Sequence, residues 1–515
     1  MSGPNSANRA VRPAAPAGRR LAELAARLGV VTDEIDVIVT GVTHDSRAVR
    51  PGDLYAALPG SHAHGASFAA QAAAAGAVAV LTDADGELLA RDSGLAVLPV
   101  DDPRLVLGPV ASWLYGEPSK QLRALGVTGT NGKTTTSFLL DAGLRAAGET
   151  TGLIGTIETR VGDEVAPSVR TTPEASDLQA LFATMVERGV SSVSMEVSSH
   201  ALALHRADGT WFEIVGFTNL SQDHLDFHAD LDDYFAAKAR LFTPEFAAAG
   251  LVNRDDEYGR RLLAAPEIAL SSFSIEGDPD AAWWASGLVT EPTGSRFVAH
   301  GPGVELELET RLPGRFNAAN ALAALAMLAS AGIDPSTAAV GIAALPGVPG
   351  RMEPVTAGQP FTALVDYAHT PEAVETLLGA LRPTTSGRLI VVLGCGGDRD
   401  AAKRPLMGAA AARLADVAVL TSDNPRSESP ERILDAVVAG AQAVPKAERG
   451  EVVVEIDRTA AIGVAVTTAQ PGDVVVVAGK GHEQGQEVAG TVHPFDDRVV
   501  LRRQLAALGW RELRA

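Results

Sequence analysis

The stretch GVTGTNGKTTT, Gly126 to Thr136, decides how the rest of this chain is interpreted. It lies between an expected strand and the helical pattern SFLLDAGLRAAG, which is the position that a phosphate-binding loop requires. Backbone amides and the start of the helix would face the phosphates, Lys133 would neutralise their charge, and Thr134 would ligate Mg²⁺. The usual spacing of such loops places glycine where Val127 stands, so we expect a variant of this loop.

Short apolar runs alternate with helical patterns beyond this loop, and the same rhythm returns after about residue 351. Because these runs are short and flanked by turn residues, we interpret them as strands. The alternation predicts an α/β fold with a doubly wound, mainly parallel central sheet and a Rossmann-like C-terminal domain. The expected strands are TGLIGTI, SSVSMEVSS, IVGFTNL and AGLVNRDD in the first group, then FTALVDYAH, RLIVVLGCGG, VAVLTSDNP, VVVEI and DVVVVAGKGHE in the second.

The length of the chain, 515 residues, exceeds what one hydrophobic core supports and indicates roughly three domains. Prolines flank the helical pattern in DDPRLVLGPVASWLYGEPSK, and glycine and proline cluster in ALPGVPGRMEP, so we place domain boundaries there. We expect a disordered tail over residues 1–19, a small N-terminal α/β domain over 20–103, a central domain over 104–350 and a C-terminal domain over 351–515.

Composition limits the class of protein. The 43 Lys and Arg residues against 63 Asp and Glu give a net charge of −20, which argues against a nucleic-acid partner because phosphate backbones need a basic surface. No apolar run approaches the ~20 residues of a membrane span, and the first residues lack the apolar core of a secretory signal. We therefore expect a cytoplasmic protein without membrane insertion. The single cysteine, Cys395, excludes a disulfide within the chain, and we expect it to be buried.

With its phosphate loop, the sequence resembles the Mur ligase family. The loop matches the pattern G-x-T-G-[TS]-N-G-K-[TS], which this family shares with the folylpolyglutamate synthetases, and the resemblance runs from about residue 20 to the C-terminus. It implies three domains that bind, in order, a UDP-sugar peptide, ATP and the incoming amino acid. The implied ATP contacts are Gly129, Thr130, Asn131, Gly132, Lys133, Thr134 and Thr135 in the loop, and Asn317, Arg351 and Asp366 beyond it.

Two clusters, MEVSSH and NLSQDHLDFH, follow expected strands and should line the same cleft. Phosphoryl transfer to a carboxylate gathers negative oxygens, so it needs a metal ion and fixed cations. The resemblance assigns Mg²⁺ to Glu196 and His224 with Thr134 and Lys238, and catalysis to Lys133, Lys238 and His224. By residue type alone, His224 is equally well explained as a surface or capping histidine, and the favoured interpretation of Lys238 is a solvated helix residue. The corresponding family lysine is carbamylated by CO₂, which we carry over to Lys238 as a hypothesis.

The N-terminal loop THDSR resembles the uridine-binding loop of the family, and RTTPE resembles a segment that holds the muramoyl dipeptide. Leu204 stands where the family has glutamine, so one substrate contact differs. The residues implied to bind the UDP-muramoyl dipeptide are Ser46, Ser61, His62, Ala63, Thr171, Thr172, Ser198 and Arg206.

The motif Asp423-Asn424-Pro425-Arg426 indicates the amino acid. Pro425 makes the turn rigid, and Arg426 offers a planar, two-pronged donor suited to a carboxylate, which favours an amino acid with a second carboxylate. The motif resembles that of family members that add meso-diaminopimelate to UDP-N-acetylmuramoyl-L-alanyl-D-glutamate. Their further contacts correspond to Arg399, Gly479 and Glu483. The alternative without function is an Asx-Pro turn with a surface arginine.

We therefore expect an ATP-dependent peptide ligase that acts through an acyl phosphate and releases ADP and phosphate. Such an enzyme would serve peptidoglycan precursor synthesis, and with it cell-wall biogenesis, cell shape and cell division. We expect small-molecule substrates and a monomer. The rival enzymes are an L-lysine-adding ligase, which would lack Arg426 because an unpaired buried guanidinium is costly, and a folylpolyglutamate synthetase. A rival from another class is a P-loop nucleotide switch, which leaves the DNPR, GGDRD and GKGHE loops without purpose.

Overall fold

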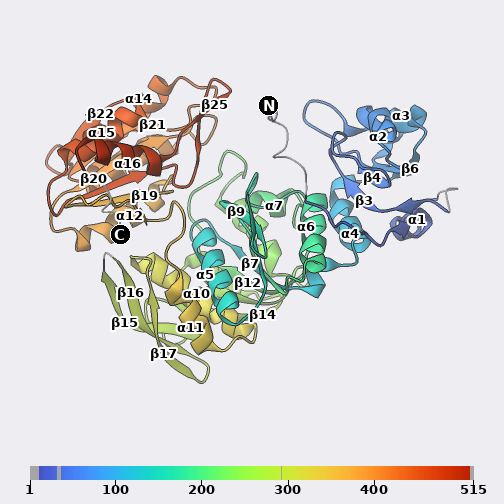
Figure 1. The fold of residues 1–515 in the computed structure, drawn as a ribbon, viewed down its shortest axis with the longest axis horizontal. Helices are drawn as coiled ribbons and strands as arrows, with labels where there is room; N and C mark the ends of the chain where they lie inside the picture. The colour runs from blue at the N-terminus through green and yellow to red at the C-terminus, as the bar shows by residue number, and fades with distance from the viewer. Residues whose placement is uncertain (1–10, 32–35, 292, 511–515) are drawn as a thin grey trace.

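Three main sheets divide the chain into three α/β domains that follow one another from the N-terminus to the C-terminus (Figure 1). The computed structural model describes residues 11–31, 36–291 and 293–510. The N-terminal sheet has four strands, the central sheet eleven and the C-terminal sheet six. This architecture confirms the predicted three-domain α/β fold.

The N-terminal domain is built on a parallel sheet whose strands lie in chain order: β3 (Gly41–Thr43), β4 (Asp53–Ala56), β5 (Ala79–Thr82) and β6 (Ala96–Pro99). Helices α1 (Leu21–Leu28) and α4 (Pro103–Leu114) pack in one core with β4, and α2 (Ala69–Ala74) and α3 (Ala84–Ala90) contribute to a second. Because Leu107, Val110 and Leu114 belong to the first core, this domain continues through α4. The boundary expected at residue 103 was therefore placed too early.

Residues 11–19, which we expected to belong to a disordered tail, make defined contacts. The Arg12 Nη1 atom lies 2.6 Å from Asp53 Oδ2, with both side chains nearly fully buried. The amides of Ala14 and Ala15 donate to the carboxylate of Glu187 in the central domain. The prediction was wrong for these residues, because composition does not reveal a single buried ion pair made across a distance in sequence. Residues 1–10 of the expected tail lie outside the described residues.

The central sheet is parallel in its middle and antiparallel at both edges. Its order is β10-β9-β8-β11-β7-β12-β13-β14-β15-β16-β17, and the run from β8 to β15 is parallel. The four predicted strands of the first group are confirmed, whereas the antiparallel extension β15 to β17 was not foreseen. The bounds are β7 Arg123–Thr128, β8 Thr151–Ile154, β9 Glu158–Val161, β10 Glu164–Pro167, β11 Ser192–Glu196, β12 Phe212–Phe217, β13 Ala247–Asn253, β14 Ala269–Ser274, β15 Trp283–Glu291, β16 Gly294–Gly301 and β17 Val304–Thr310.

Helices cover the central sheet, and the one that follows the phosphate loop packs against two others. Helix α5 (Lys133–Ala146) packs against α10 (Arg315–Ser330) and α11 (Pro335–Ala344). Helix α10 is rich in alanine and buried over most of its length, which allows close approach to α5. None of the helices in the described part of the chain combines the length and apolarity needed to cross a membrane. The remaining helices are α6 Ala175–Glu187, α7 Ser199–Ala203, α8 Leu231–Ala239 and α9 Glu257–Ala264.

The C-terminal sheet has the order β18-β19-β23-β20-β21-β22, with all pairs parallel except β18 with β19. Helices α12 (Pro371–Leu381), α13 (Lys403–Leu414) and α14 (Pro430–Ala443) share one core, while α15 (Arg458–Thr468) and α16 (Asp497–Ala507) share the other. Cys395 is buried as predicted, and desolvation raises the pKa of its thiol to about 12. The strands are β18 Glu353–Pro354, β19 Thr362–Asp366, β20 Leu389–Cys395, β21 Val417–Ser422, β22 Glu451–Val454 and β23 Val474–Ala478, followed by a hairpin of β24 Gly485–Val488 and β25 Thr491–Pro494.

A fully buried ion pair joins α15 to α16. The Arg458 Nε and Nη2 atoms lie 2.8 and 2.7 Å from the two carboxylate oxygens of Asp497, and both side chains are 0% exposed. The same guanidinium donates to the carbonyl oxygen of Ala478 at 2.9 Å and to that of Ser422 at 3.4 Å. The pair therefore holds the carboxyl ends of β21 and β23 together.

Replacing Asp497 with Asn should destabilise the C-terminal domain strongly, because the change leaves the Arg458 charge buried without its counter-ion. We expect a loss of about 3–5 kcal/mol, measured as a lower midpoint of chemical unfolding for this domain. The matched control is Asp163→Asn, since the Asp163 side chain is fully exposed and lies 4.0 Å from Arg145. Equal effects of the two substitutions would contradict the expectation.

Candidate active site

The phosphate loop connects β7 to α5 and is held by the segment after β12. Gly129 and Gly132 have φ angles of +145° and +89°. A Cβ atom would lie 2.0 Å from Thr218 Oγ1 at the first position and 2.5 Å from Asn320 Oδ1 at the second, so both positions require glycine. The amide of Thr130 donates to the carbonyl oxygen of Asn219 at 2.8 Å. The loop is thus fixed before any ligand arrives.

Two lysines, the partly exposed Lys133 and the buried Lys238, donate to the backbone of this loop. The Lys133 Nζ atom lies 2.8 Å from the carbonyl oxygens of Gly129 and Thr130, and the Lys238 Nζ atom lies 2.8 Å from the same Gly129 oxygen. Lys238 also lies over the ring of Tyr234, 4.5 Å from its centre. Desolvation lowers the pKa of Lys133 and lowers that of Lys238 well below its ordinary value. An anion placed beside these amines would favour their charged forms.

Glu196 lies at the end of β11 and joins the loop to the rest of the site. It is 1% exposed and accepts hydrogen bonds from the Thr134 hydroxyl at 2.9 Å, the Thr156 amide at 2.7 Å and the Thr156 hydroxyl at 3.0 Å. The Arg351 Nη2 atom, from the C-terminal domain, donates to Thr134 Oγ1 at 3.1 Å. Two of the predicted metal ligands, Thr134 and Glu196, therefore lie in contact.

These oxygens fit a magnesium ion, which prefers one or two carboxylates and completes its shell with water and phosphate. Within the described residues, no three His, Cys, Asp or Glu side chains gather in a way that could hold a metal. A metal at Thr134 and Glu196 would thus depend on oxygens of a bound nucleotide, which agrees with the position of the phosphate loop.

His224 follows β12 and has a positive φ of +56°. Its ring packs edge-on against the ring of His200, with 4.6 Å between ring centres. Desolvation lowers the pKa of His224 below its ordinary value, which keeps the imidazole neutral and able to bind a metal. The adjacent Asp223 reaches the C-terminal domain, with its carboxylate 3.9 Å from His369 Nε2 and 4.0 Å from Lys403 Nζ. Sequence reasoning missed these three residues, although all lie in or beside the polar loops it singled out.

Of the other predicted nucleotide contacts, Arg351 reaches the loop, while Asn317 binds the backbone just before α10 and Asp366 binds the backbone next to Arg351. The Asn317 Nδ2 atom donates to the carbonyl oxygen of Pro313 at 2.8 Å, and Asp366 accepts from the amide of Met352 at 2.8 Å. The guanidinium of Arg351 lies over the ring of Tyr367 at 4.4 Å. Asp366 thus supports the segment that carries Arg351.

Three of the predicted substrate contacts lie beside Glu196. The Thr172 hydroxyl donates to the Glu196 carbonyl oxygen at 2.9 Å and accepts from the Ser198 amide at 3.2 Å. The Thr171 hydroxyl lies 3.0 Å from that of Thr156. The structure therefore brings these residues together with the phosphate loop.

The remaining predicted substrate contacts lie further toward the N-terminal domain. The Arg206 Nε atom lies 2.8 Å from a carboxylate oxygen of Glu174, which Arg104 of the N-terminal domain also contacts at 3.3 Å. Arg104 in addition donates to the carbonyl oxygen of Leu204 at 3.3 Å. The contact at position 204 is therefore made by the backbone and not by the side chain. Ser46 is buried after β3, whereas Ser61, His62 and Ala63 are exposed after β4.

The DNPR and GKGHE loops interlock at the carboxyl edge of the C-terminal sheet. Lys480 is 0% exposed, and its Nζ atom lies 2.9 Å from both Asn424 Oδ1 and Glu483 Oε2 and 3.4 Å from Asp423 Oδ1. The Asn424 Nδ2 atom donates to Glu483 Oε2 at 2.8 Å. Gly479 has a φ of +114°, and a Cβ there would lie 2.8 Å from Asp423 Oδ2. Lys480, which sequence reasoning also missed, organises the predicted amino-acid contacts.

Arg426 and Arg399 lie beside these loops with different partners. Arg426 has a φ of +52°, and its Nη1 atom donates to the carbonyl oxygen of Gly397 at 2.6 Å. The side chain of Arg399 is 55% exposed and lies 4.0 Å from Asp226 of the central domain. Arg399 therefore lies at the junction of the two domains, and Arg426 lies within the C-terminal domain.

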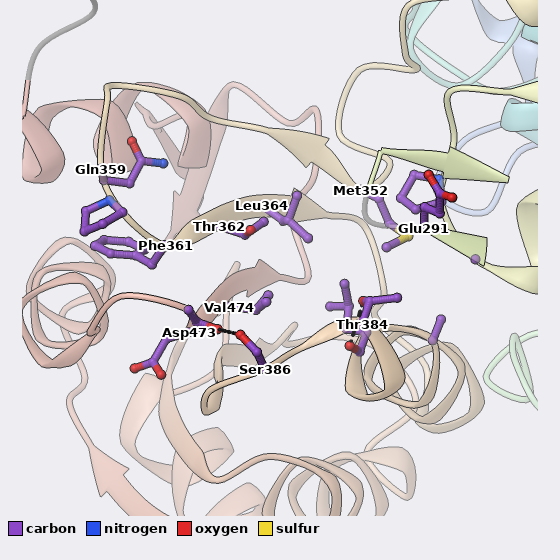
Figure 2. Close-up of a pocket in the computed structure, with 16 residues that line it drawn as sticks. Glu291, Met352, Gln359, Phe361, Thr362, Leu364, Thr384, Ser386, Asp473 and Val474 are labelled. Atoms are coloured by element: carbon purple, nitrogen blue, oxygen red, sulfur yellow. Dashed lines mark hydrogen bonds between the residues drawn. The ribbon is translucent and has the colours of Figure 1, made fainter. Parts of the chain in front are cut away.

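A separate cavity of about 410 Å³ opens at the opposite, amino edge of the C-terminal sheet (Figure 2). Apolar side chains such as Met352, Phe361 and Leu364 line it. Of its two charged residues, Glu291 and Asp473, the latter already pairs with Arg388 at 2.8 Å. The predicted site residues do not line this cavity. Ligands of open α/β sheets bind at the carboxyl ends of strands, so we assign the active site to the phosphate-loop side.

The fold and the site define a nucleotide-binding α/β protein with a phosphate loop and a second Rossmann-like domain facing it. The chain belongs to the Mur ligase family. The family's middle domain matches residues 127–328, its glutamate ligase domain matches residues 350–481, and its domain described as "Mur ligase family, catalytic domain" matches residues 38–114. The resemblance stated from the sequence is thereby confirmed.

Relatives match nearly the whole chain. The UDP-N-acetylmuramoyl-L-alanyl-D-glutamate--2,6-diaminopimelate ligase of Streptomyces avermitilis is 59% identical over 495 residues, which is 96% of this chain and 98% of that protein. The UDP-N-acetylmuramyl-tripeptide synthetase of Leifsonia xyli is 44% identical and covers 99% of this chain and 100% of its own. A solved structure of a UDP-N-acetylmuramoyl-L-alanyl-D-glutamate--2,6-diaminopimelate ligase is 32% identical, with a TM-score of 0.68 over 96% of this chain and 99% of its own.

Replacing Gly479 with Ala should strain the interlocked loops, because the new methyl group would meet the Asp423 carboxylate. We expect a loss of about 1–3 kcal/mol of stability, measured as a lower midpoint in unfolding of the C-terminal domain. Gly490→Ala is the matched control, since Gly490 also has a positive φ, +75°, but no atom lies within 4 Å of the place that its new methyl group would take. A loss no larger at Gly479 than at Gly490 would contradict this account.

Proposed function

We propose that this chain is an ATP-dependent ligase that joins meso-diaminopimelate to the D-glutamate of UDP-N-acetylmuramoyl-L-alanyl-D-glutamate and releases ADP and phosphate. The observation that carries the proposal is the pairing of the DNPR loop with the GKGHE loop beside Arg426. The names of the relatives in Streptomyces avermitilis and Leifsonia xyli support the same substrates. The enzyme would act in the cytoplasm, as a monomer, on small molecules for peptidoglycan synthesis.

The phosphate loop, from Gly129 to Thr135, would hold ATP, with Lys133 against the phosphates and Arg351 approaching from the C-terminal domain. Thr134 and Glu196, with His224 nearby, would hold Mg²⁺. When bound there, Mg²⁺ would neutralise phosphate oxygens and favour attack on the terminal phosphorus. Phosphate beside the Lys133 amine would favour its charged form and so oppose the desolvation that lowers its pKa.

The D-glutamyl carboxylate would attack the terminal phosphorus of ATP, giving an acyl phosphate and ADP. Thr171, Thr172 and Ser198 support this placement because they lie next to Glu196, at the edge of the phosphate loop. The free amine of the amino acid then attacks the acyl carbon, loses a proton, and phosphate departs. Lys133 would stabilise the negative charge that develops on oxygen in both steps.

At the amine end, the incoming amino acid carries a carboxylate and an ammonium on its distal carbon. Arg426 offers a guanidinium for the carboxylate, and Glu483 offers a carboxylate for the ammonium. L-Lysine would leave Arg426 without a substrate partner, which lowers its transition-state binding. Arg399, at the domain junction, is placed to add a second cation when the domains hold substrate.

Lys238 would be carbamylated. Its amine is 1% exposed, and its lowered pKa makes the neutral form available to add to CO₂ and lose a proton. The carbamate would place an anion beside Lys133, at a position where burial disfavours a second cation. It would also supply a further oxygen ligand to a site that has few.

The carbamate is tested by intact-mass measurement under conditions that preserve CO₂. We expect the wild-type protein to carry the additional mass of one CO₂, and Lys238→Arg to lose both this mass and activity, the latter on the order of a hundred-fold. Lys120→Arg serves as the control, because the Lys120 side chain is 54% exposed. An absent adduct together with unchanged activity of Lys238→Arg would refute the carbamate.

The function is tested by measuring phosphate release from ATP with UDP-N-acetylmuramoyl-L-alanyl-D-glutamate and either meso-diaminopimelate, L-lysine or no amino acid. We expect strong release with meso-diaminopimelate alone, because it supplies the carboxylate that Arg426 requires. Release with lysine instead would keep the ligase mechanism and refute the role of Arg426. Equal release without any amino acid would point to a nucleotide switch.

A further inference from the structure

The hairpin β24–β25 is attached to the DNPR loop through its backbone. The amide of Glu487 donates to Asn424 Oδ1 at 3.0 Å, and the amide of Arg426 donates to the carbonyl oxygen of Glu487 at 3.0 Å. Gln486 adds a side-chain bond to the carbonyl oxygen of Asp423 at 2.6 Å. The hairpin therefore holds the specificity loop without using the carboxylate of Glu487.

That carboxylate instead faces the guanidinium of Arg426. The Arg426 Nε atom lies 3.6 Å from Glu487 Oε2, which is too long for a good hydrogen bond. Meanwhile the Nη1 atom of Arg426 is held by the carbonyl oxygen of Gly397 at 2.6 Å. Because Nη1 is occupied, the edge formed by Nε and Nη2 is the one that can bind a carboxylate with two parallel hydrogen bonds. Glu487 lies on the Nε side of that edge.

We propose that Glu487 is an internal counter-ion for Arg426, and that the distal carboxylate of the incoming amino acid displaces it. Glu487 is thus a specificity-determining residue for the amine substrate. A carboxylate bound by two hydrogen bonds outcompetes a single contact at 3.6 Å. The Glu487 side chain is 39% exposed, so it can turn into water when it leaves.

This arrangement sets a condition on the substrate. Glu487 balances the charge of Arg426 while the amine site is empty. An incoming amino acid binds the Arg426 guanidinium only through a carboxylate that replaces Glu487. L-Lysine has no distal carboxylate and cannot make this exchange. The inference rests on the proposed function, because it assigns Arg426 to the amino-acid site.

The test compares the KM for meso-diaminopimelate of the wild type and Glu487→Gln in the phosphate-release assay. Glutamine keeps the backbone bonds of the hairpin and removes the competing charge. We expect the KM to fall about two- to five-fold with kcat unchanged, the size typical of a partly exposed ion pair. Turnover with L-lysine should not improve. The control is Glu448→Gln, a change at an exposed glutamate of the same domain.

An unchanged or raised KM for meso-diaminopimelate in Glu487→Gln would overturn the inference, as would an equal gain with L-lysine. If Glu487→Gln has a lowered thermal midpoint, Glu487→Asp replaces it, since the shorter side chain withdraws the carboxylate and should lower the KM in the same direction. The two failures are distinguishable. A wild type without diaminopimelate-dependent release refutes the proposed function, whereas an active wild type with unresponsive variants refutes only the role of Glu487.

Discussion

The carbonyl oxygen of Gly129 accepts hydrogen bonds from the amines of Lys133 and Lys238, and the organisation of the site depends on this contact. Amines in such a place have lost the hydration that favours their charge, so the site without ligands is short of negative charge. In the proposed function, phosphate groups would pair with the Lys133 amine, and a carbamate would replace the Lys238 amine with an anion. The glycines of the loop, the Glu196 cluster and the neutral His224 all follow from a site built to receive anions in a protein that is itself strongly acidic.

The amine site depends on a different constraint, located in the core below it. The guanidinium of Arg458, which is paired with Asp497, donates to the last carbonyl oxygens of β21 and β23. The DNPR and GKGHE loops follow these two strands. A guanidinium held by a carboxylate in a dry core has a fixed position. The Lys480 amine then joins the two loops by donating to Asn424 of one and Glu483 of the other. The position of the predicted amino-acid contacts is therefore set by the domain core rather than by loop sequence alone.

Local patterns were enough to predict the phosphate loop, the strands around it and the family, because each depends on residues adjacent in sequence. The contacts that were missed depend on distant residues. Arg12 is ordered by Asp53, α4 joins a core formed by strands before it, and Asp223 meets His369 and Lys403 of another domain. The extension β15 to β17 pairs antiparallel at the edge of a parallel sheet, so the strand-and-helix rhythm that revealed the other strands is absent there.

The hydrogen bond between Arg351 and Thr134 joins two domains through the hydroxyl expected to bind metal. Arg351 lies in the segment ALPGVPGRMEP, where the sequence placed the boundary between the central and C-terminal domains. A ligand that takes the Thr134 hydroxyl must also take it from Arg351, so binding there has an energetic link to the placement of the C-terminal domain. Occupancy of the phosphate loop would thus be coupled to the placement of the C-terminal domain, which carries the predicted amino-acid contacts.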